Sequence, residues 1–137
     1  MQDVKNGKIR YIANTFPSYG YLWNYGALPQ TWEDPDHVDS STKYKGDSDP
    51  VDILDIGTKL HLSGQVVPVK VLGALGMIDE GQTDWKIIAI DNTDPMAQKM
   101  SDISDVDIYM PGLIKTTLDW FRLYKVKEIK QNSFYAV

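Results

Sequence analysis

The fold of this chain is decided by the stretch Gly46-Asp47-Ser48-Asp49-Pro50-Val51-Asp52, which places three carboxylates within six residues and then continues into an apolar strand. Neither regular structure puts the three on one side: a strand aligns Asp47 with Asp49, and a helix aligns only Asp49 with Asp52. We therefore expect a turn to gather them. Pro50 favours one, because proline fixes its own φ and biases the preceding residue toward extended geometry.

Converging carboxylates indicate a cation site. Two unit charges ~4 Å apart repel by about 4 kcal/mol at an effective dielectric of ~20, so convergence is costly unless a cation lies between them. Oxygen ligands at this density suit Mg²⁺ or Mn²⁺. A solvated acidic turn is the alternative, since Asp, Ser, Gly and Pro build such turns readily. A calcium-binding EF-hand loop does not fit, because Asp52 and Thr58 stand where that loop needs Gly and Glu.

Composition sets the class of protein. The length of 137 residues suits one domain with a real core, so we expect a single domain over residues 1–137. A net charge of −5 argues against general affinity for nucleic acid or anionic membrane. The chain has no cysteine for disulfides or a thiol nucleophile, no signal peptide and no run of ~18 apolar residues. We predict a soluble, cytoplasmic protein.

The hydrophobic pattern predicts strands first and helices last. Period-two alternation predicts strands over residues 8–13, 51–56, 66–78 and 85–91. Within the third strand, Pro68, Gly73 and Gly76 indicate an edge with bulges, which bend a strand around a barrel. Ser101 with Asp102 and Asp105 is typical of a helix start, and apolar residues then keep helical spacing over residues 112–124. One amphipathic helix should therefore pack on a β core.

Several polar residues beside these strands leave two interpretations open. Arg10 is either an ordinary surface arginine or a fork for phosphate oxygens. Tyr25, within the aromatic run 16–32, is either a core residue or a phenol presented to a polar site. Asp84 and Lys86 share one strand face. In one interpretation they form a salt bridge. In the other, Asp79 and Asp84 hold a cation, and Lys86 contacts the anion that this cation neutralises. His37 and His61 are predicted to be ordinary surface or strand histidines. The basic residues near the C-terminus are predicted to lie mostly on a solvated helix end, with one or two of them able to reach an anion: Lys115, Arg122, Lys125, Lys127 and Lys130.

Four motifs follow one another along the chain. The first two are Gly20-Tyr21-Leu22-Trp23-Asn24-Tyr25-Gly26-Ala27-Leu28-Pro29-Gln30-Thr31-Trp32-Glu33-Asp34-Pro35 and the acidic stretch 46–52, which has the form D-x-D-P-x-D. The last two are Asp79-Glu80-Gly81-Gln82-Thr83-Asp84-Trp85-Lys86 and Trp120-Phe121-Arg122-Leu123-Tyr124-Lys125. Together they resemble the soluble family I inorganic pyrophosphatases of the eukaryotic type. The resemblance covers nearly the whole chain, and four ordered motifs are far more specific than one.

The resemblance implies a mainly β, α+β fold, a five-stranded OB-like β-barrel with flanking helices. It also implies Mg²⁺-dependent hydrolysis of pyrophosphate to two orthophosphates by a metal-activated water, with Mn²⁺ as a substitute ion, in a homodimer. The positions that match the family's metal ligands are Asp47, Asp52, Asp79 and Asp84. Asp49 matches the general base and Tyr25 an active-site tyrosine, and the groups that hold phosphate oxygens match Arg10, Lys86, Tyr124 and Lys125.

Two family segments have no counterpart in the sequence. A β segment that precedes the position of Arg10 in the family supplies a phosphate-binding lysine and metal-site glutamates, but only nine residues precede Arg10 here. A C-terminal helical tail is also expected to be absent. Full activity is thus expected to need more than these residues, and the alternative function is a catalytically weakened interaction subunit with the same fold. A barrel that binds single-stranded nucleic acid is disfavoured, because such barrels need a basic groove.

Overall fold

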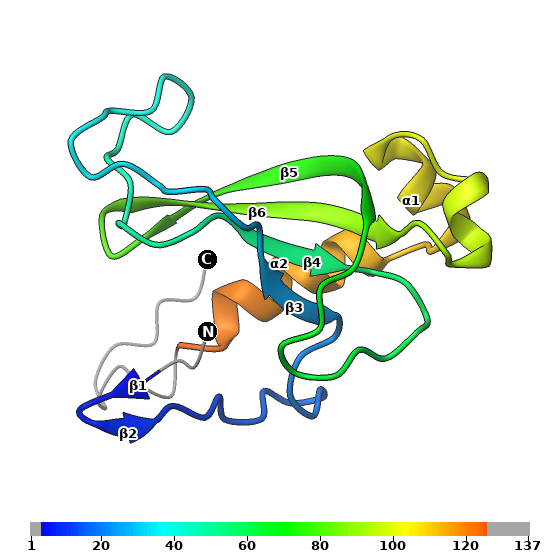
Figure 1. The fold of residues 1–137 in the computed structure, drawn as a ribbon, viewed down its shortest axis with the longest axis horizontal. Helices are drawn as coiled ribbons and strands as arrows, with labels where there is room; N and C mark the ends of the chain where they lie inside the picture. The colour runs from blue at the N-terminus through cyan, green and yellow to red at the C-terminus, as the bar shows by residue number, and fades with distance from the viewer. Residues whose placement is uncertain (1–3, 126–137) are drawn as a thin grey trace.

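The structure is a computed structural model that describes residues 4–125 of the chain. Its elements are β1 (Val4–Lys5), β2 (Lys8–Ile9), β3 (Asn24–Ala27), β4 (Asp52–Asp55), β5 (Val69–Asp79), β6 (Gln82–Asp91), the 3₁₀ helix η1 (Pro95–Gln98), α1 (Ile103–Tyr109) and α2 (Leu113–Leu123). Figure 1 shows two long curved strands, β5 and β6, with α1 at one end and a projecting loop, residues 28–51, at the other. The predicted mixture of strands followed by helices is confirmed.

Four of the strands form one mixed sheet in the order β3-β4-β6-β5. The pairs β3–β4 and β5–β6 are antiparallel, whereas β4 and β6 run parallel. The parallel pairing sets Asp52 beside Lys86 and Asp55 beside Ala89. Because the two strands run the same way, their starts meet at one end of the sheet and their ends at the other. This register brings two acidic stretches that are distant in the sequence to the same place.

The β5–β6 hairpin carries the curvature of the sheet. Its turn is the pair Glu80-Gly81, both at positive φ, as a two-residue hairpin turn requires. A register shift between Val71 and Gly73 marks a bulge, and β5 is the last strand of its sheet, so the predicted edge and bulge are confirmed. A Cβ atom on Gly73 would lie 2.8 Å from Cβ of Ile103. Glycine is therefore needed where α1 approaches the bulge.

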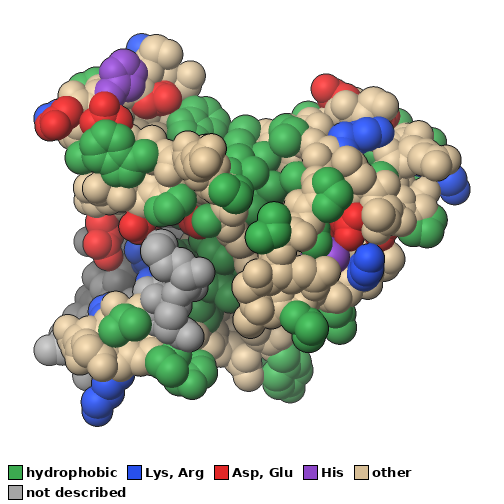
Figure 2. Space-filling view, viewed as in Figure 1, with side chains coloured by type: hydrophobic (Ala, Val, Ile, Leu, Met, Phe, Trp, Pro, Cys, Tyr) green, Lys and Arg blue, Asp and Glu red, His purple; other side chains and the backbone are tan. Residues whose placement is uncertain are grey.

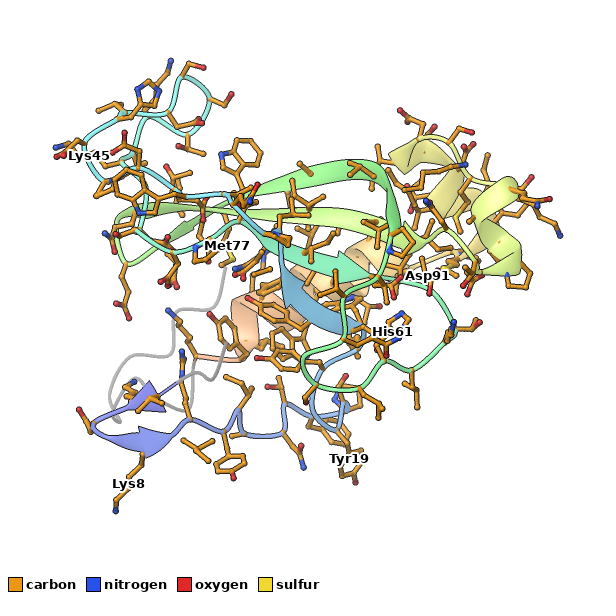
Figure 3. The ribbon with its side chains drawn as sticks, viewed as in Figure 1. Lys8, Tyr19, Lys45, His61, Met77 and Asp91 are labelled. Atoms are coloured by element: carbon orange, nitrogen blue, oxygen red, sulfur yellow. The ribbon has the colours of Figure 1, made fainter. Side chains whose placement is uncertain are left out.

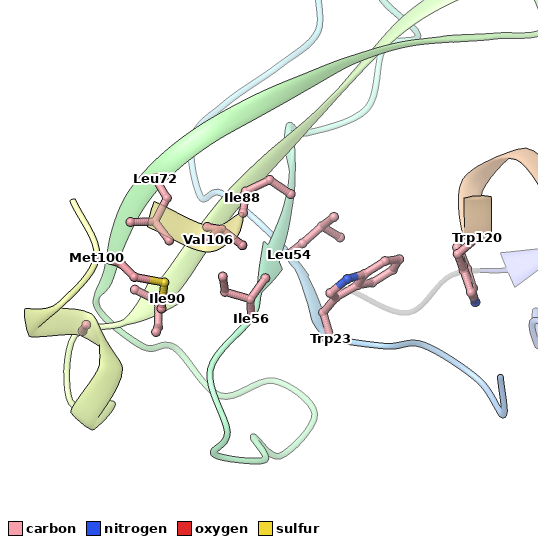
Figure 4. Packing of buried hydrophobic residues seen from close by; sticks show 10 residues of the cluster. Trp23, Leu54, Ile56, Leu72, Ile88, Ile90, Met100, Val106 and Trp120 are labelled. Atoms are coloured by element: carbon pink, nitrogen blue, oxygen red, sulfur yellow. The ribbon is translucent and has the colours of Figure 1, made fainter. Parts of the chain in front are cut away.

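The core lies between the sheet and the two helices. Leu54 of β4 and Ile88 and Ile90 of β6 are fully buried, and Figure 4 shows them in one cluster with Trp23 and Trp120. The indole of Trp23 packs edge-on against Trp120 of α2. Burying one such side chain is worth roughly 1.5–3 kcal/mol. This packing fixes α2 against the strands that carry the acidic residues.

The start of α1 and both ends of α2 lie close to where the sequence pattern predicts. Asp102 caps α1, and Asp105 returns the hydrogen bond to complete a capping box. α2 begins after Gly112 and ends at Leu123, within one residue of the predicted 112–124. Neither of these helices, nor η1, is long and apolar enough to cross a membrane.

Two local predictions are wrong. The predicted strand 8–13 shrinks to Lys8–Ile9, which pairs with β1 across a turn at Asn6-Gly7, where both residues have positive φ. Arg10 therefore follows the strand instead of lying within it. The bend in the acidic stretch falls at Ser48, with φ of 72°, and not at Pro50. The side chain of Asp47 stabilises this bend by accepting a hydrogen bond from the backbone N–H of Asp49 at 2.9 Å.

Candidate active site

The acidic residues gather where β4 and β6 begin, beneath the loop 28–51 and beside the end of α2. Figure 2 shows acidic and basic side chains meeting in a recess below this loop. The residues come from separate elements: Asp47 from the loop, Asp52 from β4, Asp84 and Lys86 from β6, and Tyr124 and Lys125 from the end of α2. The fold therefore assembles one site from all four motifs.

Three carboxylates form the acidic centre of the site. One oxygen from each of Glu33, Asp47 and Asp84 lies within 4.8 Å of the other two. Glu33 and Asp84 are buried, and Asp47 is half-buried. We call these three residues the carboxylate trio. Among the residues described by the structure, no other set of three His, Asp or Glu side chains meets this spacing.

Backbone hydrogen bonds fix the trio by pairing two parts of the loop 28–51. The N–H of Ser48 donates to the carbonyl of Glu33, and the N–H of Glu33 donates to the carbonyl of Asp49, both at 2.9 Å. The N–H of Gly46 donates to the carbonyl of Asp34 at 3.1 Å. A Cβ atom on Gly46 would lie 2.3 Å from the Glu33 carbonyl, so only glycine permits this approach. The sequence thus sets Glu33 and Asp47 side by side although 13 residues separate them.

Burial makes the trio electrostatically costly. Burial, together with the nearby charges of Asp47 and Asp84, raises the pKa of Glu33 to about 7, despite a hydrogen bond from the N–H of Trp85 at 2.8 Å. Burial also raises the pKa of Asp84, with further contributions from Asp52 and Asp47, although Lys86 opposes the shift. A divalent cation would offset this repulsion. Three carboxylate oxygens this close together are ligands of the kind that Mg²⁺ or Mn²⁺ prefers.

Asp52 is linked to the trio through Lys86. The ammonium of Lys86 donates to Asp52 and, at 2.6 Å, to Oδ1 of Asp84. It also lies 3.2 Å from the hydroxyl of Tyr25, which donates to Asp52. Asp84 and Lys86 thus form a salt bridge. Burial and the charge of Asp52 raise the pKa of Tyr25, so its phenol stays protonated.

A cavity of about 680 Å³ beside Lys86 has a basic and aromatic wall. Lys86, Tyr124 and Lys125 line it, together with Asp79, which accepts a hydrogen bond from Lys125. Arg10 is half-buried, and its charge acts on the phenol of Tyr124. Burial is the main reason why the pKa of Tyr124 is raised. The wall offers cations and hydroxyl groups of the kind that hold phosphate oxygens.

The structure brings most of the predicted residues together, but not in one group. Asp47 and Asp84 belong to the carboxylate trio, Asp52 joins it through Lys86, and Asp79 lies apart on Lys125. Asp49 is exposed in the loop beside Asp47. Sequence reasoning did not single out Glu33, although this residue lies in the first of the four motifs. No spacing rule links residue 33 to residue 47, although the close approach of Gly46 is the feature that makes the link.

A second carboxylate cluster lies at the opposite ends of β4 and β6. Asp55 accepts hydrogen bonds from the backbone N–H groups of Gly57 and Asp91 and from the side chains of Asn24 and His61, at 2.9–3.1 Å. Figure 3 shows His61 and Asp91 at this end, where Nε2 of His61 lies 3.3 Å from Asp91. The side chain of His61 is 9% exposed and contacts both of these carboxylates. His37, in contrast, is exposed as predicted.

Comparison with known families gives one consistent result. The sequence model described as inorganic pyrophosphatase matches residues 2–136. The inorganic pyrophosphatase of Drosophila melanogaster is 56% identical over 135 residues, covering 98% of this chain and 40% of its own length. The chain thus spans less than half the length of this relative.

Solved structures agree. The inorganic pyrophosphatase of Schistosoma japonicum superposes with a TM-score of 0.90 at 64% identity, covering 96% of this chain and 46% of its own. An N-terminally truncated vacuolar soluble pyrophosphatase of Trypanosoma cruzi in complex with PPi superposes at 0.85 with 47% identity, covering 93% of this chain and 47% of its own. These matches confirm the predicted fold class.

Proposed function

Because the chain belongs to the inorganic pyrophosphatase family, we propose that the protein hydrolyses pyrophosphate to two orthophosphates with the help of divalent metal ions. The observation that carries the proposal is the carboxylate trio, which lies next to the buried ammonium of Lys86 and a cavity with a basic wall. Carboxylates that could bind a cation thus lie beside lysines that could bind an anion. A metal pyrophosphate supplies both.

The metal site of the proposal consists of the trio together with Asp52 and Asp79. When bound, Mg²⁺ supplies Lewis-acid chemistry, since it lowers the pKa of the attacking water and offsets phosphate charge. Three carboxylates within 4.8 Å and a raised pKa at Glu33 and Asp84 support this assignment. Mn²⁺, which prefers similar oxygen ligands, is the expected substitute ion.

The remaining residues act on the water and the phosphates. Asp49 is exposed beside Asp47 and is the proposed general base that accepts the proton of the attacking water. Lys86, Lys125 and Arg10 offset charge on the phosphate oxygens, as phosphoryl transfer requires. Two phenols complete the site. Tyr25 and Tyr124 both have a raised pKa and so remain hydrogen-bond donors.

The proposal extends to organisation and location. We propose that residues 1–137 form one domain, supported by the single core that joins β4, β6 and α2. A homodimer is proposed from the family resemblance and from the exposed apolar side chains of Leu60, Leu62 and Val66 between β4 and β5. Light scattering measures the oligomeric state.

A cytoplasmic location is proposed, and cell fractionation tests it. No contact among the described residues favours the alternative of a non-catalytic interaction subunit.

Phosphate release from pyrophosphate tests the function directly. We expect release that requires Mg²⁺, is abolished by a chelator and is restored by added Mg²⁺ or Mn²⁺. Asp84→Asn should lower the rate by at least about 10²-fold, because it removes one charge from the metal site. The control is Asp107→Asn, the same change on the exposed part of α1. Equal rates for the two variants, or no release by the natural protein in Mg²⁺, would refute the proposal.

A further inference from the structure

The ammonium of Lys86 lies among groups that the proposed function assigns to a metal ion. It contacts Asp52 and lies 2.6 Å from Oδ1 of Asp84. Only 2% of the residue is exposed. Its neighbours on the other sides are the rings of Tyr25 and Phe121, whose centroids lie 5.7 and 5.6 Å from Nζ. Lys86 is therefore held as a cation in a cage of two carboxylates and two aromatic faces.

The cage favours the charged form of Lys86. Hydrogen bonds from its ammonium to Asp52 and Asp84 offset the cost of burying the charge. Contacts with aromatic faces add to this because ring faces attract cations. The lysine thus serves Asp52 and Asp84 in the way that a bound cation would.

A metal ion and this ammonium cannot occupy the same position. A divalent ion bonds to carboxylate oxygens at about 2.0–2.2 Å, and the ammonium already lies within hydrogen-bonding distance of both oxygens. The two cations would also repel each other at that range. Lys86 has room to leave, because it lines the cavity of about 680 Å³ that Tyr124 and Lys125 also line.

We propose that Lys86 is a built-in occupant of the cation position between Asp52 and Asp84, and that a divalent ion must displace its ammonium into the adjoining cavity in order to bind there. The inference rests on the proposed function, since it takes these aspartates as metal ligands. Its consequence is that metal and phosphate binding are coupled through one side chain. An ammonium released from Asp52 and Asp84 becomes available to phosphate oxygens beside Lys125.

Mn²⁺ titration of the metal-free protein by calorimetry tests the inference. Lys86→Met removes the ammonium and keeps the length of the side chain. If Lys86 competes with the metal, this variant should bind its weaker Mn²⁺ ion at least about tenfold more tightly than the natural protein, within the range in which neighbouring groups tune metal affinity. The control is Lys115→Met, which makes the same charge change on an exposed lysine that pairs with Asp119 of α2 instead. Screening should limit its effect to about twofold.

The outcomes separate the two proposals. Natural protein that binds Mn²⁺ and a Lys86→Met variant that binds it no more tightly would overturn this inference and leave the metal site intact. Absence of Mn²⁺ binding by both would overturn the proposed function as well. Nitrogen NMR of the lysine ammonium groups in the natural protein gives a second test that does not depend on how the variant folds. The Lys86 signal should change on addition of Mg²⁺, and an unchanged signal at saturating Mg²⁺ would also overturn the inference.

Discussion

The parallel strands β4 and β6 carry carboxylates at both ends, and the two ends differ in how those charges are satisfied. At the strand starts, Asp84 and Glu33 are buried with too few donors, and the pKa of each is raised. At the strand ends, Asp55 accepts four hydrogen bonds. The pKa of Asp91 is lowered there, first by the backbone N–H and then by the hydroxyl of Thr93. Carboxylates thus have too few hydrogen-bond donors at the strand starts and a full set of donors at the strand ends.

This contrast teaches that carboxylate density alone does not mark a metal site. A buried carboxylate is stable without a metal when backbone and side-chain donors occupy its oxygens. It becomes a candidate ligand when the surrounding structure withholds those donors. The strand ends are therefore expected to serve stability, and the strand starts to serve chemistry.

The largest expected effect is on turnover, at the strand starts. Asp49→Asn keeps the size of the side chain but removes the proposed general base, so the rate of pyrophosphate hydrolysis should fall by about 10²–10⁴-fold. Stability should change by less than about 0.5 kcal/mol, because Asp49 is exposed. Steady-state phosphate release and urea unfolding measure the two quantities. A variant that unfolds early yet retains its rate per folded molecule would assign Asp49 to the structure and not to the chemistry.

The second prediction reverses this pattern at the strand ends. Asp55→Asn replaces one acceptor oxygen with an NH₂ group, which must then face donors such as the side chains of Asn24 and His61. We expect a loss of about 3 kcal/mol in the free energy of unfolding, since a buried network loses a charged partner. Mn²⁺ affinity should be unchanged. Calorimetry and urea unfolding, with Asp107→Asn as the matched surface change, distinguish this result from a general effect of lost charge.

The third prediction concerns the loop that holds the strand-start carboxylates. Gly46→Ala would place Cβ 2.3 Å from the Glu33 carbonyl, so the two backbone segments must separate. The cost should be about 2 kcal/mol, as for other overpacked sites, and Mn²⁺ should bind at least about tenfold more weakly because Asp47 moves away from Glu33. Gly26→Ala is the control, because its Cβ would meet only Ile53 at an ordinary 3.5 Å. Equal Mn²⁺ affinities for both variants would contradict this account of Gly46.

The sequence was sufficient to predict whatever depends on local periodicity. Alternation along residues 85–91 places Lys86 on the same face as Ile88 and Ile90, and the structure buries all three. Residues 112–124 have a helical period and form α2. The D-x-D-P-x-D stretch predicts a gathered acidic site. Two of its aspartates do belong to the site: Asp47 lies close to Glu33, and Asp52 contacts Lys86. These features follow from side-chain direction within one element.

The features that were missed depend on contacts between elements. Glu33 joins the acidic centre through backbone hydrogen bonds to residues 46–49, which no periodicity encodes. The bend at Ser48 needs a non-glycine residue at positive φ, a conformation that sequence rarely signals. The loop of His61 folds back over the end of β4, where Nε2 of its ring contacts Asp55 and Asp91. In each case, the tertiary fold determines which donors reach which carboxylate.

The smallest expected effect is on pH dependence, where the two ends should have opposite signs in the absence of metal. The pKa of Glu33 is raised from about 4.3 in the unfolded chain to about 7. The folded protein therefore binds the additional proton between these values, and stability should fall as pH rises from about 4.5 to 7. The lowered pKa of Asp91 acts the other way: its contribution is complete above about pH 4 and is lost as pH falls further.

Urea unfolding in a chelator across pH 4.5–7 isolates the contribution of Glu33. Solvent at the mouth of the site screens the charge, so we expect a decline of only about 1 kcal/mol across this range. Glu33→Gln should remove the decline, because glutamine does not titrate and can still accept from the N–H of Trp85. Added Mg²⁺ should abolish it in the natural protein, since a bound cation favours the charged carboxylate at every pH in the range. If the free energy of unfolding of Glu33→Gln declined with pH as steeply as that of the natural protein, Glu33 would not be the source of the decline, and the contrast between the strand starts and the strand ends would fail.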